Sequence, residues 1–309
     1  MNFPTLNEEM LLRRLELPTE TIRMVLDTDT YNEIDDQFAV AYALLSPERL
    51  KMDAIYAAPF VGERASNPGE GMEKSHAEIL RLLERLGKKS EGFVHQGSTA
   101  WLTALETPER SPAALDLVKR AMEAPEDSPL YVVGIGAITN VASAILIEPD
   151  IIRRIVVVWL GGQPHSFHTA QEYNLKQDPL ASKTLFDCGV PLVHVPCYGV
   201  SSHLLTTVPE LESAIKGRNP ISDFLFERFC QYSLDHFAWA KEIWDIATIG
   251  YLLNGDWVPT QVIPSPILQD NLTWGVPPLG RHLIREAWYV KRNPIFHDLF
   301  LKLQRAESK

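Results

Sequence analysis

Residues 27–36 read DTDTYNEIDD and follow directly on the apolar run IRMVL at 22–26. Five carboxylates thus fall within ten residues, where an apolar strand should end and a helix, DQFAVAYALL at 36–45, should begin. Carboxylates packed this closely repel one another and resist losing water, so a partly buried cluster needs a cation or shared protons. In an open α/β sheet, ligands bind at the carboxyl ends of the strands. The stretch therefore predicts an α/β fold with a site for a hard metal ion beside its first strand.

A plainer interpretation is that Asp35 or Asp36 caps the following helix, because Asp is common at helix N-caps. A cap needs only one carboxylate, however, and leaves Asp27 and Asp29 unexplained. The helix is also apolar on nearly all sides, so its start should lie close to the core. We therefore favour a binding site over a solvated face.

Short apolar runs alternate with helical patterns through the first two thirds of the chain. This alternation is typical of βαβ units and predicts a Rossmann-like, mostly parallel sheet with helices on both faces. Strands are expected at 22–26, 52–58, 92–95, 130–133, 155–160 and 191–196, and helices at 36–45, 73–86, 112–123, 137–147 and 178–188. The C-terminal third reads as an extra helical region, strongest at 220–238 and 245–253, followed by a strand-like EAWYVKR and a closing helix NPIFHDLFLKLQ. We expect one domain over residues 1–309, with 1–20 as an N-terminal arm.

The composition limits the classes of partner. The formal net charge of −11 argues against a nucleic-acid partner, because phosphate backbones need a basic face. No apolar run is long enough to span a membrane, and the start of the chain lacks a signal-peptide pattern. The three cysteines, an odd count without metal-ligand spacing, favour a reducing cytoplasm.

The stretch LYVVGIGAITN at 130–140 reads as a strand that turns into a helix. A dinucleotide-binding fingerprint would place its third glycine or alanine at position 139, where this chain has Thr139. The turn after the first strand also has no glycine, so the pattern excludes a nicotinamide or flavin site. Helix capping and a role in the site both remain open for Thr139 and Asn140.

The stretch LGGQPHSFHTAQEYNLKQDP at 160–179 closes an apolar strand with two glycines and continues as a polar loop. Glu172 and Asn174 offer the hydrogen-bonding groups that recognition of sugar hydroxyls needs. His165 and His168 could in principle bind a transition metal. No other His or Cys stands at ligand spacing, however, which favours surface positions for both.

The stretch EIWDIATIGYLL at 242–253 opens an apolar helical run with one carboxylate, Asp245. An N-cap would explain it. As a distant partner for the acidic cluster, Asp245 would instead supply the additional oxygen ligand that a Ca²⁺ site requires. Both interpretations stay open for this segment alone.

Taken in order, four segments resemble the inosine/uridine-preferring nucleoside hydrolases, which are Ca²⁺-dependent N-ribohydrolases on a Rossmann-like sheet. The family's opening motif DxDPGxDD appears at 27–36 as DTDTYNEIDD, two residues longer and without Pro-Gly. ITNVA at 138–142 is similar to LTNxA, EYNLKQDP at 172–179 to EFNxxxDP, and DIA at 245–247 to DPxA. The resemblance covers about residues 22–253. It implies cleavage of the N-glycosidic bond of a ribonucleoside or related riboside, by a homodimer or homotetramer.

Carried over by position, the family pattern implies that Asp29, Asp36 and Asp245 bind Ca²⁺ together with the backbone carbonyl of Thr139. Asp27 would lie behind these ligands and orient them. Asp29 would also accept the proton of the attacking water, whose pKa a metal lowers. The residues implied to hold the sugar hydroxyls are Asp35, Glu172 and Asn174. Carboxylates around the ring would favour the positive charge of an oxocarbenium-like transition state.

The departures from the family lie on the leaving-group side. Many members have a His immediately before the late Asp that helps to protonate the departing base. Here that residue is Trp244, which lacks a useful acid but offers a flat wall for stacking. The family's Asn after the second strand is replaced by Phe60, and a longer loop offers Asn67 instead. Other candidates for help to the leaving group are His165, His168, Tyr173 and His236.

Two further interpretations use the same residues. An apolar strand before Asp-x-Asp also opens haloacid-dehalogenase-type phosphatases, with Asp27 as nucleophile and Asp29 as acid. These phosphatases need a later strand that ends in an acidic pair, and none of the strands expected after residue 130 ends in such a pair. The second interpretation is a Ca²⁺-dependent sugar- or nucleoside-binding protein that lost turnover through Trp244. Release of reducing sugar from a nucleoside panel would separate binding from catalysis.

Overall fold

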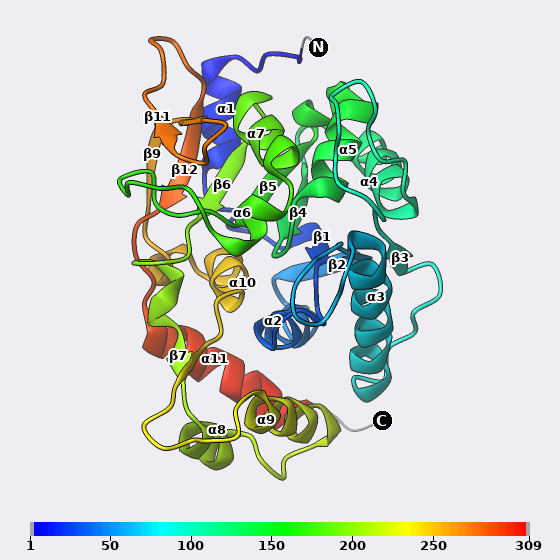
Figure 1. Ribbon diagram of the computed structural model, residues 1–309, viewed down its shortest axis with the longest axis vertical. Helices are drawn as coiled ribbons and strands as arrows, with labels where there is room; N and C mark the ends of the chain where they lie inside the picture. The colour runs from blue at the N-terminus through cyan, green and yellow to red at the C-terminus, as the bar shows by residue number, and fades with distance from the viewer. Residues whose placement is uncertain (1–2, 307–309) are drawn as a thin grey trace.

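The computed structural model describes residues 3–306, which build an eight-stranded sheet with helices on both faces (Figure 1). The helices are α1 Glu8–Leu15, α2 Asp35–Leu44, α3 Pro68–Arg85, α4 Pro112–Glu123, α5 Thr139–Ile147, α6 Tyr173–Gln177, α7 Pro179–Asp187, α8 Val208–Ala214, α9 Pro220–Tyr232, α10 Ile246–Leu253 and α11 Arg292–Arg305. The strands are β1 Ile22–Thr28, β2 Leu50–Ala57, β3 Val94–Gln96, β4 Leu130–Gly134, β5 Ile155–Leu160, β6 Leu192–Val195, β7 Leu205–Thr206, β8 Lys241–Glu242, β9 Thr260–Pro264, β10 Ile267–Leu268, β11 Trp274–Gly275 and β12 Leu283–Ala287.

The order of the large sheet is β3-β2-β1-β4-β5-β6-β12-β9. Its strands are parallel except for β9, which runs antiparallel to β12 at the edge. The chain runs outward from β1 in one direction and from β4 in the other, so the order reverses between these two neighbours. In doubly wound folds, ligands bind in the crevice at such a reversal. The predicted α/β fold is confirmed, and it places residues 27–36 at that crevice.

Successive residues of β1 point to opposite faces of the sheet, as the pleat requires. Met24 and Leu26 are fully buried in the core that also holds Phe38 of α2. Val25 is buried in the opposite core, with Val141 of α5. Because both faces of the strand are covered, its end delivers Asp27 and Asp29 into the interior instead of to a solvated turn.

The predicted elements are present with shifted ends. The six strands expected in the first two thirds of the chain appear as β1 to β6. The helix expected at 73–86 begins earlier, because Asn67 caps it by accepting a hydrogen bond from the Glu70 N–H and Pro68 suits its first turn. The helix expected at 220–238 ends at Tyr232, and Ala238 has a φ of 51°, which a right-handed helix does not use.

The later part of the chain supplies helices and the edge of the sheet. As expected, it contains α8 to α11, and α8, α9 and α11 lie together at one end of the molecule (Figure 1). The strand expected at 286–292 lies earlier, as β12, and its antiparallel neighbour β9 was not expected. The N-terminal arm contains α1, which contacts β12. Within residues 3–306, no helix is long and apolar enough to cross a membrane.

Candidate active site

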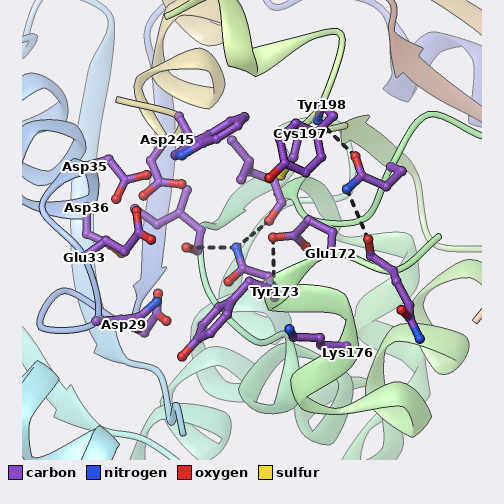
Figure 2. Close-up of a pocket in the computed structure, with 17 residues that line it drawn as sticks. Asp29, Glu33, Asp35, Asp36, Glu172, Tyr173, Lys176, Cys197, Tyr198 and Asp245 are labelled. Carbon is purple, nitrogen blue, oxygen red and sulfur yellow. Dashed lines mark hydrogen bonds between the residues drawn. The ribbon is translucent and has the colours of Figure 1, made fainter. Parts of the chain in front are cut away.

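A pocket of about 830 Å³, counting its open mouth, lies at the carboxyl ends of β1, β4, β5 and β6 (Figure 2). Its lining residues are Asp29, Asn32, Glu33, Asp35, Asp36, Ile135, Leu160, Gln163, Gln171, Glu172, Tyr173, Asn174, Lys176, Cys197, Tyr198, Trp244 and Asp245. The acidic residues near β1 stand on one side, and Glu172 and Cys197 on the other. The pocket therefore joins the segments that the sequence had marked separately.

The acidic side is built by two helix starts. Oxygens of Asp35, Asp36 and Asp245 lie within 4.8 Å of one another, and all three residues are buried. Asp35 and Asp36 are in the first turn of α2, whose N-cap is Ile34, and Asp245 is the N-cap residue of α10. Asp245 thus has the N-cap position that the sequence allowed, but neither helix has a side-chain capping hydrogen bond, so capping does not explain why these carboxylates are buried. The helix dipoles instead aim two positive ends at the cluster.

Burial makes this cluster costly without a counter-charge. Loss of hydration, followed by the charges of Asp36 and Asp35, raises the pKa of Asp29 well above its ordinary value. Burial and neighbouring Asp charges likewise raise the pKa of Asp245 and Asp36. Burial and the charge of Glu33 raise the pKa of Asp35 to about 6. The Thr28 hydroxyl, which donates to Asp36 Oδ1 at 2.5 Å, offsets part of this rise for Asp36. Such a cluster needs protons or a cation.

Asp29 directly follows β1 and lines the same pocket as this cluster. Its Oδ2 is buried and has no hydrogen-bond partner within residues 3–306. Gly136 leaves room for it, because a Cβ at that position would come within 2.8 Å of Asp29 Oδ1. An oxygen-only set of carboxylates with an unpartnered buried oxygen fits a hard divalent cation, which takes oxygen ligands. The residues present therefore suit the metal that the resemblance implied.

Asp27 lies behind the pocket and is fully buried. Burial raises its pKa to about 7, although the Asn140 amide opposes this shift by donating to Asp27 Oδ1 at 2.8 Å. Asn140 Oδ1 in turn accepts hydrogen bonds from the N–H and the hydroxyl of Ser98. The question left open for Asn140 thus has an answer: it orients Asp27 and makes no helix cap, since the N-cap residue of α5 is Ile138.

The structure corrects the role expected for Thr139. Its hydroxyl donates to Asp178 at 2.8 Å, and the residue is outside the set that lines the pocket. The pocket instead contains Ile135, four residues earlier, whose backbone carbonyl accepts a hydrogen bond from the Asn174 amide at 3.4 Å. The physical reason is position in the turn: Ile135 directly follows β4, whereas Thr139 is already inside α5.

The opposite wall presents hydrogen-bond acceptors. Glu172 is the N-cap of α6 and accepts from the N–H groups of Gly162, Asn174 and Leu175. Burial raises its pKa. The Asn174 side-chain amide donates to the carbonyls of Leu160 and Ile135, which leaves its own carbonyl oxygen for the pocket. These acceptor atoms can therefore accept hydrogen bonds from the O–H groups of a sugar.

Trp244 lines the pocket as expected, with Tyr198 packed edge-to-face at 5.6 Å between ring centroids. Asn67 and His168 do not line it. Asn67 is exposed and caps α3, and His168 is exposed in the loop before α6. Both predictions followed from loop sequence, which fixes neither where a loop runs nor which way its side chains point.

The other candidates for help to the leaving group are engaged elsewhere. His165 Nδ1 lies 2.6 Å from Glu286, and Glu286 also lies 3.1 Å from Nδ1 of the buried His194. The exposed His236 contacts the Cys230 carbonyl. Tyr173 does line the pocket, but its hydroxyl donates to the Val61 carbonyl and burial raises its pKa.

Several lining residues were missed by the reasoning from sequence. They are Asn32, Glu33, Ile135, Leu160, Gln163, Gln171, Lys176, Cys197 and Tyr198. For Asn32 and Glu33 a signal existed, because the opening loop is two residues longer than the family motif. The polar residues at the ends of β5 and β6 carried no pattern that sets them apart from surface residues.

Comparison with known proteins agrees with this geometry. Residues 24–283 match the family described as inosine-uridine preferring nucleoside hydrolase. The chain belongs to this family. It is therefore an N-glycosyl hydrolase of ribonucleosides by descent, and the haloacid-dehalogenase alternative is excluded.

Its relatives in the nucleoside hydrolase family are distant. A non-specific ribonucleoside hydrolase, RihC, of Salmonella schwarzengrund is 24% identical over 76% of this chain and 79% of its own. A pyrimidine-specific ribonucleoside hydrolase, RihA, of Citrobacter koseri is 27% identical over 71% of this chain and 76% of its own. The solved plant nucleoside hydrolase PpNRh1 shares the fold with a TM-score of 0.72 at 20% identity, over 92% of this chain and 99% of that one.

Proposed function

We propose that this nucleoside hydrolase uses Ca²⁺ to cleave the N-glycosidic bond of a ribonucleoside or related riboside, releasing base and ribose. The observation that carries the proposal is the buried carboxylate cluster, which shares one pocket with Asp29, whose Oδ2 is unpartnered within residues 3–306, and with the acceptor wall of Glu172 and Asn174. One side of the pocket then suits a divalent cation and a water molecule, and the other suits a sugar.

The metal ligands would be Asp29, Asp36 and Asp245, with the backbone carbonyl of Ile135 in the place first expected for Thr139. Asp27 would lie behind these ligands, held in place by its hydrogen bond with Asn140. Bound there, Ca²⁺ would lower the pKa of a water molecule. Asp29 would then accept the proton of the attacking water, because its Oδ2 has no hydrogen-bond partner within residues 3–306.

The sugar would lie between the two walls. Asp35, Glu172 and Asn174 offer acceptor atoms to its hydroxyl groups. As the glycosidic bond breaks, the ring gains positive charge, and fixed carboxylates around it favour that charge over the neutral substrate. The leaving group would lie against Trp244.

The other expectations complete the proposal. The chain would act as one domain with residues 1–20 as its arm, in the reducing cytoplasm, as a homodimer or homotetramer. Neither a nucleic acid nor a membrane is a partner in this proposal; a small nucleoside or riboside is.

The test combines metal binding with turnover. Calorimetry should show one Ca²⁺ bound to the parent protein and none to Asp36→Ala, whereas Asp270→Ala, at an exposed position, should bind as the parent does. Release of reducing sugar from a nucleoside panel and from p-nitrophenyl riboside should require Ca²⁺. Unchanged binding in Asp36→Ala would refute the ligand assignment. Metal-dependent ribose binding without any turnover would identify the non-catalytic alternative.

A further inference from the structure

Glu33 is an acidic side chain of the pocket for which the proposed chemistry has no use. It belongs to the opening loop that is longer here than in the family motif, and it lines the pocket with Asn32 and Trp244. Its side chain keeps 36% of its exposure, so a ligand can reach it. Figure 2 places it beside Asp36, on the side away from Glu172.

Lys241 of β8 holds this carboxylate. Its Nζ donates to Glu33 Oε2 at 2.6 Å and to the Glu242 carbonyl at 3.3 Å, and its side chain is 10% exposed. Burial alone would lower the pKa of Lys241, but the charges of Asp35 and Glu33 outweigh burial and raise it. The ammonium therefore keeps its charge and fixes the Glu33 carboxylate in place.

The same ammonium places Glu33 on the leaving-group side. Nζ of Lys241 lies 5.8 Å from the ring centroid of Trp244 and 5.3 Å from that of Tyr232. Glu33 and Trp244 thus flank one cation. A flat ring stacked on Trp244, with Tyr198 at its side, would turn an edge toward Glu33.

We infer that Glu33 selects ribosides whose aglycone presents an N–H donor, such as an amino-substituted base, over those with a carbonyl at that edge. This inference rests on the proposed function and names its substrate class. An ionised carboxylate only accepts hydrogen bonds. An amino group therefore gains a charge-assisted bond, whereas a carbonyl oxygen meets a like-signed partner and gains no hydrogen bond from the carboxylate. Lys241 is a positioning residue for Glu33.

The test compares matched nucleosides that differ at one edge. Cytidine should exceed uridine, and adenosine should exceed inosine, in kcat/KM by roughly 10- to 100-fold, the size expected for a hydrogen bond to a charged group. In Glu33→Gln both ratios should fall toward one, because an amide donates as readily as it accepts. Lys241→Met should reduce the ratios and Lys241→Arg should retain them. Glu212→Gln, which breaks an exposed Lys–Glu pair of the same 2.6 Å length, is the matched control.

A second measurement separates this inference from the proposed function. p-Nitrophenyl riboside has neither edge, so its Ca²⁺-dependent hydrolysis tests the function alone. Free cytosine and adenine should inhibit that reaction more strongly than uracil and hypoxanthine do, and Glu33→Gln should remove the difference. Equal inhibition by all four bases, or ratios unchanged in Glu33→Gln, overturns the role of Glu33 even when the riboside is cleaved. If the riboside is not cleaved either, the proposed function fails first.

Discussion

The two sides of the pocket differ in how closely they follow the family. On the metal and sugar side, Asp29, Asp36, Asp245 and Asn174 occupy the positions that the family motifs mark, and the structure brings them to one pocket. On the leaving-group side, Trp244 replaces a histidine, and the pair of Glu33 and Lys241 has no counterpart in those motifs. The comparison indicates that bond cleavage is shared with the family, whereas the choice of leaving group belongs to this chain.

The largest expected effect tests the shared side. Asp29→Ala should lower the turnover of every substrate by roughly 10³-fold or more, because it removes both a proton acceptor and a metal ligand. Steady-state kinetics on inosine and on p-nitrophenyl riboside should show similar losses for both. A loss confined to inosine would place Asp29 on the leaving-group side and reverse the comparison. Asp270→Ala serves as the control.

The next effect tests the divergent side. General-acid help typically supplies 10²–10⁴-fold, and a base that leaves as a poorly stabilised anion needs it most. With Trp244 in place of histidine, inosine should be cleaved less efficiently than p-nitrophenyl riboside by about this factor. Trp244→His should narrow the gap by raising inosine turnover. Comparable efficiencies in the parent would show that another residue already acts as the acid, with Tyr173 the first to mutate.

A smaller effect is expected when a residue proposed to bind the sugar is removed. Asn174→Ala should weaken binding of ribose-like ligands by on the order of 1–3 kcal/mol, because a hydroxyl loses its acceptor in a buried site. Titration calorimetry with ribose measures this, with the exposed Asn271→Ala for comparison. Equal affinity in Asn174→Ala would mean that the amide only supports the carbonyls of Leu160 and Ile135.

The last prediction concerns the stability of the fold and the buried carboxyl of Glu286. Burial would raise the pKa of Glu286, but hydrogen bonds with His165 and His194 outweigh it and lower the pKa to about 2. A lowered carboxyl pKa stabilises the fold above its ordinary value near 4, and this stability is lost as the pH falls toward 2. Between pH 5 and 3 the loss should be on the order of 2 kcal/mol. Urea unfolding of Glu286→Gln should show a shallower slope over this range; an identical slope would contradict the assignment.

The sequence was sufficient for β1, β4, β5 and β6 because each is a short, mostly apolar run buried on both faces, which leaves a clear signal. It also marked the acidic cluster, since only a site explains so many carboxylates at a strand end. It could not place Asn67 and His168, because the path of a loop depends on what it packs against. Thr139 and Ile135 are four residues apart, and a motif alone does not show which of their backbone carbonyls faces the pocket.

The packing of α2 against α10 has a consequence for how the protein is assembled. Asp36 and Asp245 come from opposite thirds of the chain, and docking these helices forces like charges together. A cation that binds only when these helices are packed together would link the first and last parts of the chain and stabilise the folded state by mass action. The melting temperature should then rise with the free Ca²⁺ concentration.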